Sequence, residues 1–246
     1  MKVLILYAHP EPTSFNGALK DAAVQTLEGT GHEVRVIDLY ATGFDPVLKA
    51  EDFAAGRLDP IRLDIGREQT RAVEQETQPE EIAAAQAALA WTDLLILQFP
   101  MWWYGMPAIM KGWFDRVLAR GFAYAPGRKY DTGLLAGKLA MVSVTTGTSA
   151  ATYMPDGIDG DILSVLWPIH NGILRYTGFD VLPPFCAFMP GRISPAERQA
   201  VIEAWRRRLA EIETLPQLFF HPRDDYGPDE RLRPGVLARS GIQRNV

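Results

Sequence analysis

Short, continuous apolar runs alternate along this chain with stretches of helical periodicity, and this alternation most constrains the fold. The runs at residues 2–7, 93–99 and 139–144 have the length of strands. Apolar residues at helical spacing follow the first run, and a long alanine-rich stretch precedes the second. Apolar strands that alternate with helices are typical of a parallel sheet covered on both faces.

Two more strands complete the predicted sheet, one near residues 32–40 and one at 185–188. Five such strands favour a flavodoxin-like, doubly wound α/β fold with strand order 2-1-3-4-5, whose ligands lie at the carboxyl ends of the strands. We expect residues 1–220 to form this domain and residues 221–246 to form a C-terminal arm that packs at a dimer interface.

Composition excludes several classes of function. The 246 residues carry a net charge of -5, which gives no support to nucleic-acid binding. The one cysteine, Cys186, cannot form an internal disulfide, so a reducing cytoplasm is the expected compartment. No segment approaches the ~20 apolar residues of a membrane helix, and the run before His9 is too short for a signal peptide. We expect no membrane insertion.

Three loops should share one edge of the sheet: 8–17, 99–106 and 145–153. The first contains neither G-x-G-x-x-G nor a Walker motif, which argues against a dinucleotide-binding Rossmann domain and against an NTPase. Thr13 or Ser14 caps the following helix and leaves the amides of Phe15 and Asn16 free, as in an anion site. A plain capped helix explains the same residues equally well.

The second loop is rich in aromatic residues. Trp113 falls inside a predicted helix and is expected in the core, whereas Trp102, Trp103 and Tyr104 lie on an irregular segment before Pro107. Three large rings there would expose apolar area unless a ligand, a partner or the arm covered them. The third loop is small and polar, and its Gly147 allows close approach to the backbone. Together the loops favour a flavin or another planar cofactor over a cofactor-free sheet.

At these loops the sequence resembles the NAD(P)H:quinone oxidoreductase family of the DT-diaphorase type. The matching segments run along almost the whole chain and include "AHPEPTSFNGALKDAA", "LQFPMWWYGMPAIMKGWFDRV", "TTG", "GIDGDILSVLWPIHNGIL" and "PAERQAVIEAWRRRL". The resemblance implies a homodimer with active sites at the interface and non-covalent FAD, FMN being the lesser expectation. It also implies NAD(P)H as co-substrate, a quinone or similar acceptor, and no metal.

The resemblance also assigns site residues. The cofactor-binding set is His9, Phe15, Asn16, Met101, Trp102, Trp103, Tyr104, Thr145, Thr146, Gly147, Thr148, Tyr153 and Arg198, with Arg198 at the adenine end. Tyr153 and Gly147 are the expected catalytic positions. The substrate pocket is formed by Trp103 and Tyr104 together with Tyr124 and Tyr176 of the partner subunit.

The family mechanism is ping-pong: NAD(P)H passes a hydride to the flavin and leaves, and a quinone then takes two electrons in the same slot. The alternative is a regulatory subunit of a membrane ion-efflux system with little turnover. A simple electron-carrying flavodoxin is disfavoured because the first loop lacks a Thr/Ser-rich phosphate cradle.

The sequence departs from the family pattern at two positions. Asp159 stands where the family has a histidine that works with the tyrosine matched by Tyr153, and Pro126 replaces a second tyrosine. A carboxylate beside a reduced flavin would oppose its negative charge. We therefore expect Asp159 to point away, towards solvent or an arginine.

Overall fold

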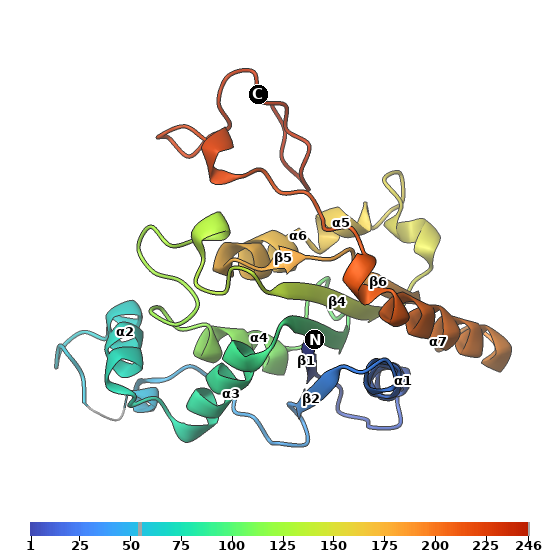
Figure 1. Ribbon diagram of the computed structural model, residues 1–246, viewed down its shortest axis with the longest axis horizontal. Helices are drawn as coiled ribbons and strands as arrows, with labels where there is room; N and C mark the ends of the chain where they lie inside the picture. Colours follow the sequence, from blue (N-terminus) through green and yellow to red (C-terminus); the bar gives the residue numbers. More distant parts are fainter. Residues whose placement is uncertain (54–55, 246) are drawn as a thin grey trace.

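A parallel sheet forms the centre of the molecule, as the computed structural model of residues 1–53 and 56–245 shows (Figure 1). Within these residues the sheet has six strands in the order β2-β1-β3-β4-β5, with β6 also paired to β4. The strands are β1 (Lys2–Tyr7), β2 (Glu33–Asp38), β3 (Leu94–Pro100), β4 (Leu139–Thr146), β5 (Asp180–Val181) and β6 (Phe185–Phe188). The predicted flavodoxin-like order is confirmed.

Two short strands, β5 and β6, share the position beside β4 at the edge of the sheet. β5 pairs with the start of β4 and β6 with its end, both in parallel register. Pro183 and Pro184 lie between them, and proline has no backbone N–H to donate to a ladder. The strand predicted at 185–188 is present as β6. The short β5 before the prolines is an additional strand.

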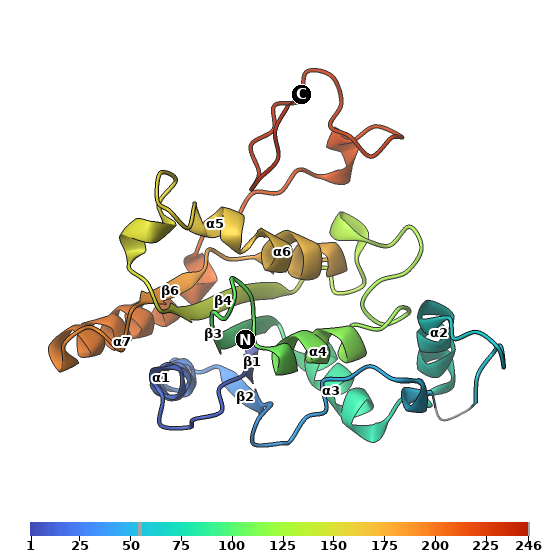
Figure 2. The ribbon, with the colours of Figure 1, turned by 180° about the vertical axis from the view of Figure 1, so that it is seen from behind.

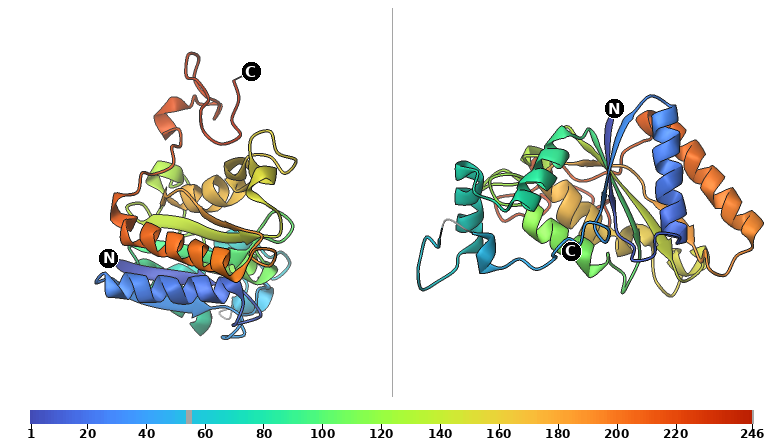
Figure 3. Two further views of the ribbon diagram at one scale, coloured as in Figure 1. Left: turned by 90° about the vertical axis from the view of Figure 1, so that its right-hand side faces the viewer. Right: turned by 90° about the horizontal axis from the view of Figure 1, so that it is seen from below.

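Helices cover both faces of the sheet, as the edge-on view in Figure 3 shows. One face carries α1 (Phe15–Gly29) and α7 (Pro195–Ala210), and Trp205 of α7 lies fully buried with its Nε1 donating to the carbonyl of Leu19 over 3.0 Å. The other face carries α3 (Glu80–Trp91), α4 (Ala108–Val117), α5 (Ile162–Val165), α6 (Trp167–Ile169) and a π-helical turn (His170–Arg175). Trp113 of α4 is fully buried, as predicted.

The long connection after β2 contains a 3-10 turn (Ala50–Asp52) and α2 (Ile65–Gln75). A buried ion pair fastens it to α4: the Arg116 guanidinium donates to both carboxylate oxygens of Asp52, over 2.8 and 3.0 Å. Arg116 also donates to Glu81 and to the carbonyl of Asp45. Three hydrogen bonds from one buried cation hold a connection that has little apolar periodicity of its own, and a fourth joins the same cation to α3.

Residues 221–245 form an arm that extends from the sheet and its helices in two opposite views (Figures 1 and 2). The described part of the arm folds on itself: His221 bonds Asp225 over 2.8 Å, and Gln243 donates to the hydroxyl of Tyr226 over 2.7 Å. Residues of the arm, of α6 and of the π-helical turn together line a cavity of about 280 Å³. The arm also contacts the body directly: the Arg223 amide donates to the Asp131 carboxylate over 2.6 Å, and Gly241 packs on the ring of Trp167.

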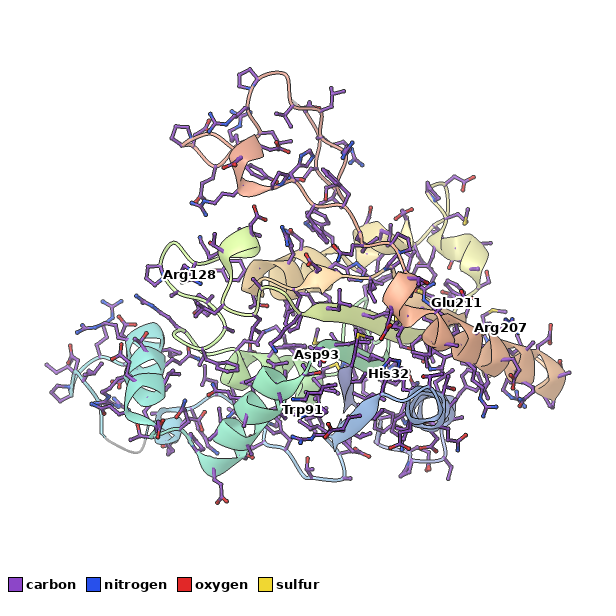
Figure 4. The ribbon with its side chains drawn as sticks, viewed as in Figure 1. His32, Trp91, Asp93, Arg128, Arg207 and Glu211 are labelled. Carbon is purple, nitrogen blue, oxygen red and sulfur yellow. The ribbon has the colours of Figure 1, made fainter. Side chains whose placement is uncertain are left out.

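Structural contacts close the amino-terminal edge of the sheet, where His32 and Asp93 lie (Figure 4). The Met1 amine lies 2.9 Å from Nδ1 of His32, and the Lys2 amide donates to the Asp93 carboxylate over 2.7 Å. The guanidinium of Arg35 stacks 3.9 Å over the ring of Trp91. The candidate functional residues belong to the opposite edge.

Candidate functional site

The first loop ends in a helix terminus that presents unpaired amides. Ser14 is the N-cap of α1, and its hydroxyl accepts from the Gly17 amide over 3.2 Å. The first intrahelical hydrogen bond runs from Ala18 to the carbonyl of Ser14, so the amides of Phe15 and Asn16 precede it. An anion at this terminus would meet both amides and the positive end of the helix dipole.

Side chains from three segments meet beneath this terminus. Asn16 is 3% exposed, and its Nδ2 donates to the Thr145 hydroxyl over 2.8 Å. The buried Gln98 donates from Nε2 to Oδ1 of Asn16, also over 2.8 Å. The side chains of Asn16 and Thr145 are thus bonded to each other, which leaves the backbone amide of Asn16 to face a ligand. Gln98 was not predicted; a polar residue inside the apolar run 93–99 was its signal.

The aromatic loop ends in a strained two-residue tip. Trp102 and Gly105 exchange two backbone hydrogen bonds of 3.0 Å, which forces Trp103 and Tyr104 into the left-handed region at φ +52° and +58°. Aromatic residues rarely adopt this region, and such strain gathers at functional sites. Trp103 is 98% exposed, and Trp102 and Tyr104 are also exposed. Local backbone geometry therefore holds three rings out of the core.

The three predicted loops come together at the carboxyl edge of the sheet. The ring of His9 lies 6.4 Å from that of Trp102, which joins the first loop to the second. The Met101 amide donates to the Thr145 carbonyl over 2.8 Å, which joins the second to the third. Asn16 and Thr145 join the first to the third.

The third loop presents backbone and hydroxyl groups beside open space. The Thr146 hydroxyl donates to the carbonyl of Thr148 over 2.8 Å, and a Cβ placed on Gly147 would meet no atom within 4 Å. Tyr153 is buried against Phe188, and within the described residues its hydroxyl has only a long contact of 3.6 Å, to the sulfur of Met101. That hydroxyl is poorly satisfied and can donate to a ligand.

Asp159 forms no ion pair with an arginine among the described residues, and its orientation relative to a flavin stays a prediction. Its carboxylate accepts from the Tyr104 hydroxyl over 2.7 Å and from the Thr148 hydroxyl over 3.2 Å. Both partners belong to the expected cofactor-binding set. Hydroxyl donors satisfy the carboxylate, so it needs no cation and can remain inside the site.

Two other groups of expected residues lie outside this convergence. Arg198, in the first turn of α7, donates to the carbonyls of Pro190 and Ile193 in the loop after β6. Tyr124 and Tyr176 are half-buried and pack edge-to-face with ring centroids 5.6 Å apart. The two tyrosines thus cover part of each other's surface, which is less exposed than expected.

Cys186 is unsuited to redox chemistry of its own. It lies in β6, where burial raises the pKa of its thiol to about 12, with Arg208 opposing the shift in part. A thiol with so high a pKa is a poor nucleophile at neutral pH. The described residues also contain no group of three His, Cys, Asp or Glu side chains that could hold a metal, and no helix long and apolar enough to cross a membrane.

Comparison with known proteins shows the family to which the chain belongs. The profile of a family described by its flavodoxin-like fold matches residues 1–211. The chain belongs to the flavodoxin-like family. Within that family, human ribosyldihydronicotinamide dehydrogenase [quinone] is 44% identical over 211 residues, which are 86% of this chain and 91% of the human protein. Rat NAD(P)H dehydrogenase [quinone] 1 is 39% identical over 242 residues, 98% of this chain and 88% of the rat protein.

A solved flavodoxin-like structure extends the similarity to the arm. A Klebsiella pneumoniae protein described as a quinone reductase is 40% identical, with a TM-score of 0.93 over 100% of this chain and 98% of that one. At these identities and coverages the chain is a member of the NAD(P)H:quinone oxidoreductase group of flavodoxin-like proteins.

Proposed function

We propose that the protein is a flavin-dependent NAD(P)H:quinone oxidoreductase whose site is the convergence of the loops after β1, β3 and β4. The observation that carries the proposal is the strained tip, which holds Trp103 almost fully exposed beside the open space at Gly147. The names of the human and rat relatives favour this enzyme over a regulatory subunit.

The residues present fit a flavin. The amides of Phe15 and Asn16 at the start of α1 would hold its phosphates. Met101 and the rings of Trp102 to Tyr104 would form one wall of a planar slot, and the segment from Thr145 to Thr148 the other. Aromatic walls with a few fixed polar groups are the usual lining of such sites.

When bound, the flavin would accept a hydride from NAD(P)H and deliver two electrons to the acceptor. The residues of the chain would position the reacting molecules and stabilise the charge that develops. The tip would orient the reacting rings and exclude water, the open backbone at Gly147 would allow close approach, and Tyr153 would donate a hydrogen bond to negative charge that develops during reduction.

FAD is the proposed flavin. Arg198 and the loop after β6 supply surface that a minimal flavodoxin-like sheet lacks and that could cover an adenine. A hydrogen bond from the Met189 amide to the Thr146 carbonyl holds this loop beside the end of β4. The competing cofactor is FMN, which is bound in general stress protein 14 of Treponema denticola, a solved structure 27% identical to this chain with a TM-score of 0.60. Release of the flavin from purified protein and its chromatographic identification decide between the two; FMN alone would overturn the FAD proposal.

A homodimer with shared sites is proposed as the active form. A groove of about 380 Å³ runs past Leu48, Ile65, Tyr124 and Tyr176, and Ile61 near it in sequence is 92% exposed. A partner would cover this apolar surface, and the projecting arm would reach over that partner. Trp103→Ala and Tyr176→Ala test the sharing of sites: each variant alone should be impaired, and mixed dimers should regain activity. Recovery absent from mixed dimers, or an active monomer in sedimentation, would contradict the proposal.

A cytoplasmic location belongs to the same proposal and is supported by the single cysteine. The central test is steady-state oxidation of NADH and of NADPH by the purified, flavin-loaded protein with a soluble quinone. We expect one quinone reduced per NAD(P)H, with the parallel-line kinetics of a ping-pong enzyme. Tight flavin binding with negligible turnover would favour the regulatory alternative.

A further inference from the structure

The segment that carries Asp159 closes tightly on itself. The Asp159 amide donates to the carbonyl of Thr152 over 2.9 Å, and the segment turns back at Gly157. A Cβ on Gly157 would lie 2.3 Å from that same carbonyl, and Gly160 has a φ of +76°. Two glycines at positions that exclude or strain other residues thus fix the direction of the Asp159 side chain.

Both oxygens of the Asp159 carboxylate are used, one on each wall of the slot. Oδ1 accepts from Tyr104 on the aromatic tip, and Oδ2 accepts from Thr148 on the threonine loop. The Thr148 hydroxyl is itself supported by Thr152, whose Oγ1 donates to it over 3.1 Å. Asp159 therefore links the aromatic tip to the threonine loop, in addition to the longer contact of 3.6 Å from the Tyr153 hydroxyl to the Met101 sulfur.

The hydrogen bond to Asp159 restrains Tyr104 at the strained tip. The tip is held at its base by the pair Trp102–Gly105, and beyond that pair its two rings are exposed. The bond to Asp159 anchors one of them. Because the Tyr104 hydroxyl donates its one hydrogen to Asp159, it cannot also donate to an acceptor in the slot.

The carboxylate remains charged at neutral pH. Hydrogen bonds from Thr152, Tyr104 and Thr148 lower the pKa of Asp159, and the bond to the carboxylate raises the pKa of Tyr104. Among the described residues no lysine, arginine or histidine forms an ion pair with Asp159. An unneutralised negative charge thus stands between the two walls.

We propose that Asp159 is a specificity-determining residue, which anchors the aromatic tip to the threonine loop and selects neutral or cationic electron acceptors over anionic ones. This inference rests on the proposed quinone reductase function. It names the charge class of the acceptor, which follows from the position of the carboxylate between the walls.

The test compares three soluble quinones that carry no charge, a sulfonate or a quaternary ammonium group. In Asp159→Asn, kcat/KM for the sulfonated quinone should rise by about twofold to fivefold, as expected for one solvent-screened charge. The value for the cationic quinone should fall by a similar factor, with both changes expressed relative to the neutral quinone, whose own value reports the loss of the anchor. The control is Asp156→Asn, an exposed carboxylate of the same segment whose loss changes net charge equally.

Equal effects of the two substitutions would show that the preference follows the net charge of the protein and would overturn the proposal. The same change in kcat/KM with all three quinones would also overturn it. The anchoring role has a readout that needs no turnover. The ultraviolet titration of the Tyr104 phenol, obtained as the difference from Tyr104→Phe, should shift to lower pH in Asp159→Asn and stay unchanged in Asp156→Asn. An unshifted titration would refute the anchor. A protein that shows this shift and reduces no quinone would refute the proposed function alone.

Discussion

Asn16 and Thr145 lie 129 residues apart in the sequence, and the amide of the first donates to the hydroxyl of the second over 2.8 Å. Both side chains are buried, so the pair sets the position of the α1 terminus on the end of β4. A ligand that contacts the amides of α1 and the backbone of the threonine loop meets two surfaces that are fixed to each other before it arrives.

Asn16→Ala should lower the free energy of unfolding by about 2 to 3 kcal/mol, because it leaves buried groups of Gln98 and Thr145 without a partner. Urea denaturation of the apoprotein measures this, since the flavin would otherwise add its own stabilisation. Asn245→Ala, in the exposed end of the arm, is the control and should change little. An unfolding free energy equal to that of the wild type would show that the buried network contributes nothing.

Tyr153→Phe should slow flavin reduction by NAD(P)H about tenfold, the loss of one modest hydrogen-bond donor. Among the residues that the structure describes, the hydroxyl has no strong partner, so its removal should leave the fold intact. Stopped-flow measurement on flavin-saturated protein isolates this step. Tyr40→Phe, outside the expected site residues, serves as control. An unchanged rate in Tyr153→Phe would exclude its hydroxyl from the reaction.

Arg116→Met should destabilise the protein by about 3 to 5 kcal/mol, because it leaves the Asp52 carboxylate buried without its cation. Lys111→Met on the same helix removes a cation from an exposed pair with Asp115 and should have little effect. Thermal and urea unfolding compare the two variants. Equal stabilities would mean that the connection after β2 does not depend on the buried pair.

His170 should make the protein less stable in mild acid. Burial lowers its pKa from 6.5 to about 4, so the unfolded chain binds a proton that the folded chain does not as the pH falls below 6.5. The stability from neutral His170 is present above pH 6.5 and is lost as the pH falls towards 4. Between pH 7 and pH 5 the loss should be about 2 kcal/mol.

The measurement is urea unfolding at both pH values for the wild type and His170→Gln, which should lack this part of the pH dependence. A pH dependence that persists undiminished in His170→Gln would assign the acid sensitivity to other groups.

The sequence predicted the sheet because its strands are continuous apolar runs, and it predicted the α1 cap because Ser14 precedes a helical pattern. It could not predict the conformation of Trp103 and Tyr104, since aromatic residues seldom adopt positive φ and no glycine marked the tip. The position of Asp159 was also out of reach. Its contact with Tyr104 spans 55 residues and depends on how two loops fold, whereas the expectation considered only the charge of the flavin.

Pro183 and Pro184 have a consequence for the protein in a crowded solution. The outer strand of a sheet offers a row of free N–H and C=O groups on which another chain can grow. Here that row is broken where the prolines separate β5 from β6, and the Leu218 amide already occupies the carbonyl of Val181. The side of the sheet that borders the site is therefore a poor template for strand addition, and this should limit aggregation when the protein is concentrated.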